Sequence, residues 1–168
     1  YLDLVVFGSA AMLIYEDDAN VFRCYNQALG EYFLGQNYKM EVDTFAREFP
    51  MKVNQVVDQF GIEHCSDQTR RLYKQGGANL RRDVWINHVI EPNTDDKSSV
   101  AKKFPIRETY WEKTGTTNGG LVLRQGGFNE VPGVFPRDEL TGNDSYGTGP
   151  GMDALGDIIQ LQFMTKKK

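Results

Sequence analysis

The stretch VDTFAREFPMKVNQVVDQFG, residues 42–61, decides the fold, because two different apolar patterns meet in it. Its first part, Val42 to Phe49, is rich in β-branched and aromatic residues and predicts a strand. Its second part has the spacing of one helix face, i, i+3, i+4 and i+7, at Val53, Val56, Val57 and Phe60. Gly61 stands where a C-terminal helix cap belongs. A strand that leads directly into a short helix indicates a mixed fold.

Strand patterns continue on both sides of this stretch. Periodicity does not separate helix from strand in the apolar runs 4–7 and 12–15, for which we expect a short helix and then a buried strand. Residues 20–49 predict an antiparallel meander. Further strands are expected at 83–91, 106–113, 121–124 and 128–135, with an exposed loop at 92–99 and a hairpin tip at 115–120. Pro132 and Gly133 interrupt the last of these strands, which indicates an edge strand or a bulge. The fold class is therefore α+β, with antiparallel strands and short helices.

Two more helices are expected. Ser66 is placed to cap a short helix that stops at Gly76 and Gly77. The last helix, over 150–168, begins near Pro150 and has an apolar stripe at Met152, Leu155, Ile159 and Phe163, with Ile158 and Leu161 beside it. This pattern predicts an amphipathic helix whose stripe covers the core of the domain. The three lysines at its far end have no apolar partners, so that end is expected to project from the body.

The turn into this last helix is the most distinctive motif. Gly147-Thr148-Gly149 before a helix invites a phosphate-binding interpretation, but a dinucleotide fingerprint needs a small residue where Met152 stands, and the Gly-Lys-Ser/Thr of a Walker loop is absent. A helix-entry turn that needs positive φ explains the glycines better. The expected structural motif comprises Tyr146, Gly147, Gly149, Pro150, Gly151 and Leu155.

The composition of the 168 residues is that of one ordinary domain over 1–168, with 40% hydrophobic and 25% charged residues. Nineteen basic against 23 acidic side chains give a net charge of −4, which excludes a uniformly basic surface and leaves a local basic patch open. No stretch approaches the roughly 20 apolar residues that span a bilayer, so no membrane partner is expected. Because the chain begins without Met and ends at Lys166 to Lys168 inside an expected helix, we expect an excerpt of a longer polypeptide.

The histidines and cysteines are candidates for metal binding or catalysis. Cys24 and Cys65 are too few for a disulfide framework and are expected to be buried, reduced thiols. His64 and Cys65 could both bind a metal ion, but neighbouring residues rarely converge on one ion, so a loop histidine and a buried thiol are favoured. His88 alternates with apolar residues and is expected to be a hydrogen-bonded core histidine, since no Gly-x-Ser-x-Gly elbow accompanies it.

Two acidic sets and one aromatic set complete the candidates. Glu16 to Asp18 and the pair Asp95 and Asp96 could hold a divalent cation, but solvated loop carboxylates are favoured because the pattern of a calcium loop is absent. Trp85, Tyr110 and Trp111 lie near Arg81, Arg82 and Arg107 and could stack on single-stranded nucleic acid, although core and cross-strand pairing is favoured. We therefore expect no catalytic residue, no metal site and no cofactor.

Four blocks in chain order carry a resemblance to a known family. They are DLVVFG at 3–8 with LIYE at 13–16; FAREFPM at 45–51 with QVVDQFG at 55–61; ETYWEK at 108–113 with GGF at 126–128; and YGTGPGMDAL at 146–155 with 157–158 and 161–162 behind it. Together they resemble the head-to-tail connector family of podoviruses, the portal proteins of short-tailed phages. The last block is the most specific, and the ordered set covers nearly the whole chain.

The resemblance implies a structural, non-enzymatic protein. Such portals form a homo-oligomeric ring, typically a dodecamer, at one capsid vertex of the virion, and double-stranded DNA is packaged and ejected through its channel. Implied partners are terminase, scaffold, capsid and tail proteins, met first in the host cytoplasm during assembly. The chain is similar to most of the wing region, with 150–168 as the start of the stem helix. The alternatives are a small nucleic-acid-processing or phosphate-binding enzyme domain and a tail adaptor module.

Overall fold

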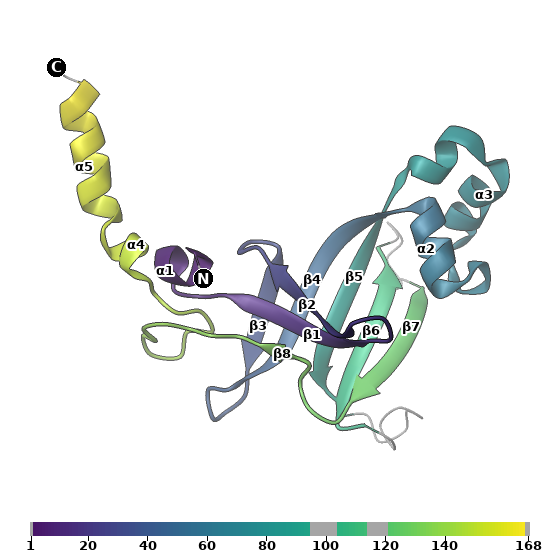
Figure 1. Cartoon of the computed structure of the whole chain (residues 1–168), viewed down its shortest axis with the longest axis horizontal. Helices are drawn as coiled ribbons and strands as arrows, with labels where there is room; N and C mark the ends of the chain where they lie inside the picture. Colours follow the sequence, from purple (N-terminus) through teal and green to yellow (C-terminus); the bar gives the residue numbers. More distant parts are fainter. Residues whose placement is uncertain (1, 95–103, 114–120, 167–168) are drawn as a thin grey trace. The chain divides into compact units, whose positions relative to one another are not determined.

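A computed structural model describes residues 2–94, 104–113 and 121–166 (Figure 1). Residue contacts divide the chain into two compact units, the first formed by Tyr1–Val42 with Pro132–Lys168 and the second by Asp43–Val131. The expectation that residues 1–168 form a single domain stays a prediction, since two compact units can belong to one domain or to two. The expected hairpin tip at 115–120 and most of the expected loop at 92–99 lie outside the described residues.

The first unit is built on a small antiparallel sheet of order β2-β1-β8. In chain order its elements are α1 (Leu2–Phe7), β1 (Ala11–Asp17), β2 (Val21–Gln27), β3 (Tyr32–Gln36), β8 (Gly133–Val134), α4 (Pro150–Asp153) and α5 (Leu155–Lys166). β1 pairs with β2 along its whole length, from Ala11 opposite Gln27 to Asp17 opposite Val21. The inward-facing Leu13 of β1 is fully buried, whereas six of the seven residues of the edge strand β2 are exposed.

The second unit contains the antiparallel meander β4-β5-β6-β7 with helices at one end. Its elements are β4 (Val42–Lys52), α2 (Val53–Phe60), the 3-10 helix η1 (Ile62–His64), α3 (Asp67–Gln75), the 3-10 helix η2 (Gly77–Arg81), β5 (Asp83–Pro92), β6 (Ile106–Glu112) and β7 (Val122–Phe128). The core cluster lies where α2 meets the sheet and consists of Val56, Phe60, Cys65, Ile86, Tyr110 and Leu123. Each large apolar side chain buried there contributes about 1.5–3 kcal/mol to stability.

The local signals for α2 and α3 are confirmed. Gly61 ends α2 with φ +85, and its N–H donates to the carbonyl of Val57. The Ser66 side chain accepts a hydrogen bond from the Thr69 N–H and caps α3, which ends at Gly76 with φ +66. The α+β fold class is therefore confirmed, and these helices form where the sequence places them.

Two expectations about the strands are wrong in part. β2 pairs with β1 and not with β3, so the strands of residues 20–49 do not form one continuous meander. The strand expected at 128–135 is much shorter than expected, because β7 ends at Phe128 and only Gly133–Val134 pair again, as β8; its expected place at a sheet edge is confirmed. Pro132 has no N–H to donate to a ladder, and its carbonyl instead accepts a hydrogen bond from the Ile14 N–H at 2.9 Å.

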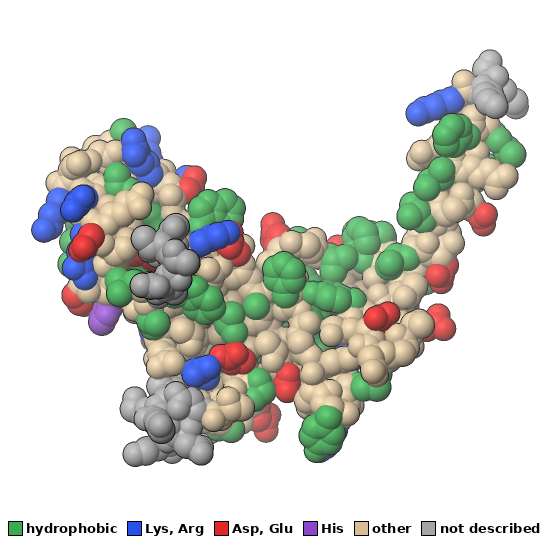
Figure 2. All heavy atoms as spheres, turned by 180° about the vertical axis from the view of Figure 1, so that it is seen from behind, with side chains coloured by type: hydrophobic (Ala, Val, Ile, Leu, Met, Phe, Trp, Pro, Cys, Tyr) green, Lys and Arg blue, Asp and Glu red, His purple; other side chains and the backbone are tan. Residues whose placement is uncertain are grey.

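The C-terminal helix is confirmed, but the expectation that its stripe covers the core is wrong. The helix is interrupted at Ala154, which separates the short α4 from the longer α5. All the large apolar side chains of α5 are exposed, Phe163 at 67% of its surface, and green side chains lie along the face of this helix that Figure 2 shows. The expected stripe does not stand alone, since Leu161 and Met164 fill the opposite side of the helix.

Candidate functional site

The motif 146–151 packs against the beginning of the chain within the first unit. The Gly147 N–H donates to the buried Ser9 hydroxyl at 2.8 Å, and the Asp138 N–H donates to the Gly8 carbonyl at 2.8 Å. We call this contact the glycine junction and define it by Gly8, Ser9, Gly147, Gly149 and Gly151. It joins two segments separated by more than 130 residues, since Ser9 and Gly147 are 138 positions apart.

Glycine is required at the junction because the backbones lie too close together for side chains. A Cβ on Gly147 would lie 2.8 Å from the Asp138 nitrogen, one on Gly149 would lie 3.0 Å from the Gly8 Cα, and one on Gly151 would lie 2.7 Å from the Val6 carbonyl oxygen. The expectation of positive φ in the turn is wrong, because Gly149 has φ −108 and the left-handed glycines of the described chain lie elsewhere. At the junction itself, Gly8 has the positive φ, +72.

Tyr146 ties the same turn to β3. Its hydroxyl accepts a hydrogen bond from the Leu34 N–H at 3.0 Å and donates to the Tyr32 carbonyl at 3.3 Å. The Tyr32 and Tyr146 rings lie 6.4 Å apart, and burial raises the pKa of the Tyr32 phenol to about 12. Arg137 adds bonds to the Gln36 side chain and the Met40 carbonyl. The turn thus holds α1, β3 and α4 in one unit.

The geometry of the turn supports a structural role over phosphate binding. Two N–H groups that a phosphate would need are already used, by the bond from Gly147 to Ser9 and by the bond from Thr148 to the Glu139 carbonyl at 2.7 Å. The helix that follows, α4, has only four residues. The structural role of the six motif residues stays a prediction, and Leu155 lies apart from the junction as an exposed residue of α5.

The second unit contains a buried polar network around His88, which is confirmed as a hydrogen-bonded core histidine. His88 is fully buried and stacks on the Tyr110 ring at 4.1 Å. The Arg47 Nε–H donates to His88 Nδ1 at 3.2 Å, so the other ring nitrogen, Nε2, carries the proton and donates to Glu108 Oε1 at 3.0 Å. Glu108 also accepts from Tyr110 and Arg124.

Burial sets the charge state of this histidine. Desolvation lowers the pKa of His88 below its ordinary value of 6.5 and outweighs the hydrogen bond to Glu108, which acts in the opposite direction. Neutral His88 uses both ring nitrogens in hydrogen bonds to Arg47 and Glu108, and this arrangement leaves neither nitrogen to serve as a base. The network therefore joins β4, β5, β6 and β7 as a structural element.

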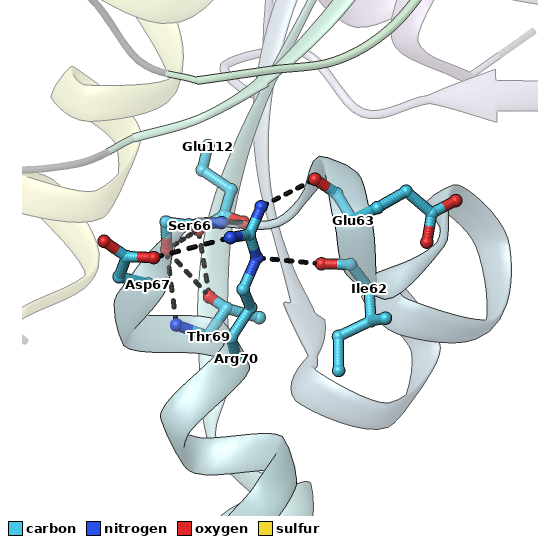
Figure 3. A network of polar contacts seen from close by, with 7 residues as sticks. All are labelled: Ile62, Glu63, Ser66, Asp67, Thr69, Arg70 and Glu112. Atoms are coloured by element: carbon cyan, nitrogen blue, oxygen red, sulfur yellow. Dashed lines mark hydrogen bonds and ion pairs between the residues drawn. The ribbon is translucent and has the colours of Figure 1, made fainter.

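A second buried carboxylate, Glu112, fixes the start of α3 (Figure 3). Glu112 is 2% exposed and accepts hydrogen bonds from the Ser66 N–H at 2.8 Å, the Ser66 hydroxyl at 2.6 Å and the Thr69 hydroxyl at 2.9 Å. A negative charge is favourable there because a helix N-terminus carries partial positive charge. Arg70 completes the corner by donating to the carbonyls of Ile62 and Glu63.

Sequence reasoning missed the partners in both networks. The signal available was the strand period of two, which places Glu108, Tyr110 and Glu112 on one face of β6. A charged residue at an inward strand position indicates a buried partner, because an unpaired buried charge is very costly.

The remaining thiol, imidazole and indole candidates do not form a reaction centre. Cys65 is buried, as expected, and burial raises the pKa of its thiol to about 11, while the neighbouring His64 is exposed in η1. The expectation that Cys24 is buried is wrong, because it lies on the exposed edge strand β2. Trp85 is half-exposed on β5, and Tyr110 belongs to the core as favoured.

The acidic candidates are equally ordinary. The Asp17 carboxylate accepts bonds from the N–H groups of Ala19 and Asn20 and pairs with Arg23 at 2.7 Å. The bond from Ala19 is the main cause that holds the pKa of Asp17 below its usual range. Asp95 and Asp96 lie outside the described residues. Within residues 2–94, 104–113 and 121–166, no group of three or more His, Cys, Asp or Glu side chains is placed to hold a metal ion.

In the part of the chain that the structure describes, no helix is both long and apolar enough to span a membrane.

The whole chain matches one family and two curated relatives. The family is described as bacteriophage head to tail connecting protein, and its model matches residues 1–168. The chain is 36% identical over 173 residues to the portal protein of Salmonella phage epsilon15, and 33% identical over 171 residues to the probable portal protein of Bordetella phage BPP-1. All of this chain aligns with each relative, and it spans 30% of the relative's length.

Proposed function

The chain belongs to the family of bacteriophage head to tail connecting proteins, and from this we propose that it is part of a phage portal. The resemblance noted in the sequence is thereby confirmed. In the proposed function, identical subunits form a ring, a dodecamer, through which double-stranded DNA is packaged and ejected. The chain supplies most of the wing, and residues 150–168 begin the stem.

The structural observation that carries the proposal is the exposed apolar surface of α5. Six of its twelve residues are large and apolar, and every one is at least 45% exposed: Leu155, Ile158, Ile159, Leu161, Phe163 and Met164. Single exposed apolar residues are normal, but a contiguous set on one short helix marks an interaction site. In a closed ring every subunit makes the same head-to-tail contact with the next one. If α5 forms part of that contact, its apolar surface is covered in every subunit.

The partners of the whole protein follow from this role. The proposed location is the portal vertex of the virion, reached after assembly in the host cytoplasm. Terminase docks on the ring during packaging and tail proteins follow it, while scaffold and capsid proteins surround it. These partners are part of the proposal, because the chain spans only 30% of the curated relatives.

The proposed role includes no catalysis. The one buried histidine has both ring nitrogens engaged, by Arg47 and by Glu108. Nuclease and nucleotide-hydrolysis assays with Mg²⁺ are expected to give no turnover above a heat-killed control. Reproducible turnover that is lost in Asp17→Ala would contradict the proposal and favour the alternative of a nucleic-acid-processing enzyme.

Self-association tests the proposal directly. Light scattering should show the 168-residue chain as mostly monomer in dilute solution, and a form extended to the length of the relatives as a closed ring. Two results would refute the ring: a monomeric extended form at high concentration, or an open, concentration-dependent series of oligomers. The latter would favour a tail adaptor that needs another protein to assemble.

A further inference from the structure

The helical end of the second unit carries a concentration of positive charge. Residues 66–83 hold five basic and two acidic side chains, in a chain whose net charge is −4. Figure 2 shows the blue side chains gathered at the upper left, over the helices of this unit. The rest of the chain holds 14 basic and 21 acidic side chains, so this segment carries a net charge of +3 and the remainder one of −7.

Four of these cations form one exposed group, which we call the α3–η2 basic cluster: Arg71, Lys74, Arg81 and Arg82. Arg71 and Lys74 are three residues apart on α3 and therefore share a helix face. Arg81 ends η2, which packs against α3, and Arg82 follows it. Two hydrogen bonds hold the Arg82 backbone: its N–H donates to the Asn79 carbonyl, and its carbonyl accepts from the Val53 N–H.

The cluster differs from the cations around it in its lack of partners. Arg70 uses its guanidinium on two carbonyls and on Asp67, and Lys52 pairs with Asp83 at 2.7 Å. The four cluster side chains form no ion pair with any residue that the structure describes. Their charge is therefore available to a partner.

The surroundings of the cluster indicate which partner it fits. Between residues 53 and 82, all of which the structure describes, no large hydrophobic side chain is exposed. The centre of a protein interface is enriched in aromatic residues and Met as well as Arg, whereas a phosphate backbone is bound by charge-assisted hydrogen bonds. Three of the four cations are arginines, whose planar guanidinium groups match phosphate oxygens two at a time.

We propose that the α3–η2 basic cluster is a contact surface for the phosphate backbone of double-stranded DNA, without preference for sequence. The inference extends the proposed function, because it assigns DNA contact to one surface of this chain, and it does not depend on ring assembly. Four phosphate contacts release counterions, so the slope of log affinity against log salt is expected to be about −3.6. Such a contact is strong at low salt and weak at high salt, which is compatible with DNA that must move.

The test is fluorescence anisotropy of a short labelled duplex with the 168-residue chain, from about 50 mM to about 200 mM salt. Two double variants probe the cluster, Arg71→Glu with Lys74→Glu and Arg81→Glu with Arg82→Glu. The matched control, Lys39→Glu with Lys166→Glu, makes the same change in net charge at exposed positions elsewhere. Each cluster variant is expected to weaken binding at least about tenfold and to flatten the slope by about 1.8, while the control changes affinity by less than about twofold.

Three results would overturn the inference. They are no duplex binding at the lowest salt, an equal loss of affinity in the control, and tighter cluster-dependent binding of polyglutamate than of the duplex, which would assign the cluster to an acidic protein. Thermal melting shows whether each variant folds, and either double variant suffices for the comparison. Light scattering on the same samples reports assembly separately, so failure of DNA contact and failure of the ring are distinguishable.

Discussion

The glycine junction shows how a single residue can constrain the chain. At Gly149 the reason for glycine is the backbone of Gly8, which leaves no room for a Cβ. The motif was visible in the sequence, and its position before a helix was predicted correctly. The reason was not predictable, because the partner of Gly147 lies 138 residues away and nothing near the motif points to it.

We predict that Gly149→Ala destabilises the protein by about 1–3 kcal/mol, the usual cost of forcing an extra carbon into a closely packed site. The matched control is Gly156→Ala in α5, where a Cβ meets nothing within 4 Å. That exchange should leave stability unchanged or raise it by up to about 1 kcal/mol, because alanine favours a helix over glycine. Urea denaturation of both variants is the measurement. Equal midpoints for Gly149→Ala and wild type would show that the junction is not tightly packed.

Phosphate distinguishes a packed junction from a ligand site. If the turn is filled by its own backbone, neither inorganic phosphate nor a nucleotide should change the melting temperature of the wild-type chain. A rise that grows with ligand concentration would mean that the folded state binds the anion, and it would contradict the structural role of the motif.

Among the secondary-structure elements, local signals succeeded and distant ones failed. Gly61 and Ser66 mark the ends of α2 and α3 through hydrogen bonds within a few residues, so the sequence displays them. The pairing of β8 with β1 connects Val134 to Met12, and no local pattern reveals it. The network around His88 likewise draws its members from three other strands, so the sequence predicts a hydrogen-bonded core histidine but not the residues that bond to it.

We predict a specific acid sensitivity from the His88 network. Unfolded histidine titrates near 6.5, and burial lowers the pKa of His88 in the folded chain. Below 6.5 the unfolded chain therefore binds a proton that the folded chain does not, and stability falls as pH falls, by up to about 1.4 kcal/mol per pH unit. This contribution is fully present above 6.5.

The groups that face His88 are Arg47 on β4, Glu108 and Tyr110 on β6, and, through Glu108, Arg124 on β7. Urea denaturation of His88→Gln between pH 5 and 7 should show a smaller dependence on pH than wild type. His64→Gln, at an exposed histidine, is the control and should keep the wild-type slope. Parallel slopes in all three proteins would refute the assignment of the acid sensitivity to His88.

The start of α3 gives a second prediction for an element. Glu112→Gln replaces an acceptor oxygen with an amide that faces the Ser66 and Thr69 donors. The expected cost is about 1–3 kcal/mol, the penalty for leaving buried polar groups without partners. Glu130→Gln makes the same exchange at an exposed position and should change stability by less than about 0.5 kcal/mol. Similar denaturation midpoints for the two variants would contradict a capping role for Glu112.

For the whole molecule, the informative failure concerns α5. The sequence pattern predicts a stripe that covers the chain's own core, yet the structure leaves every apolar residue of this helix exposed. The spacing of apolar residues is the same whether a helix face packs on the core of its own chain or on a neighbouring subunit, so the sequence pattern does not distinguish the two cases. We propose that in the ring this helix lies at the contact with the next subunit.

We predict that Leu161→Asp with Phe163→Asp prevents assembly of the form extended to the length of the relatives. Both side chains are more than 60% exposed, so the double change should alter the stability of the 168-residue chain by only about 0.5 kcal/mol per site. The control is Gln160→Asp with Gln162→Asp, which adds the same charge to polar positions of α5 and should retain assembly. Sedimentation of the extended forms is the measurement, and equal assembly of the two double variants would show that α5 is not an interface.

The most direct test of the central claim is electron microscopy of the extended form, purified without other phage proteins. The portal assignment predicts closed rings of one rotational symmetry with a central channel. Single subunits or irregular aggregates, from a protein whose melting curve shows that it is folded, would contradict it.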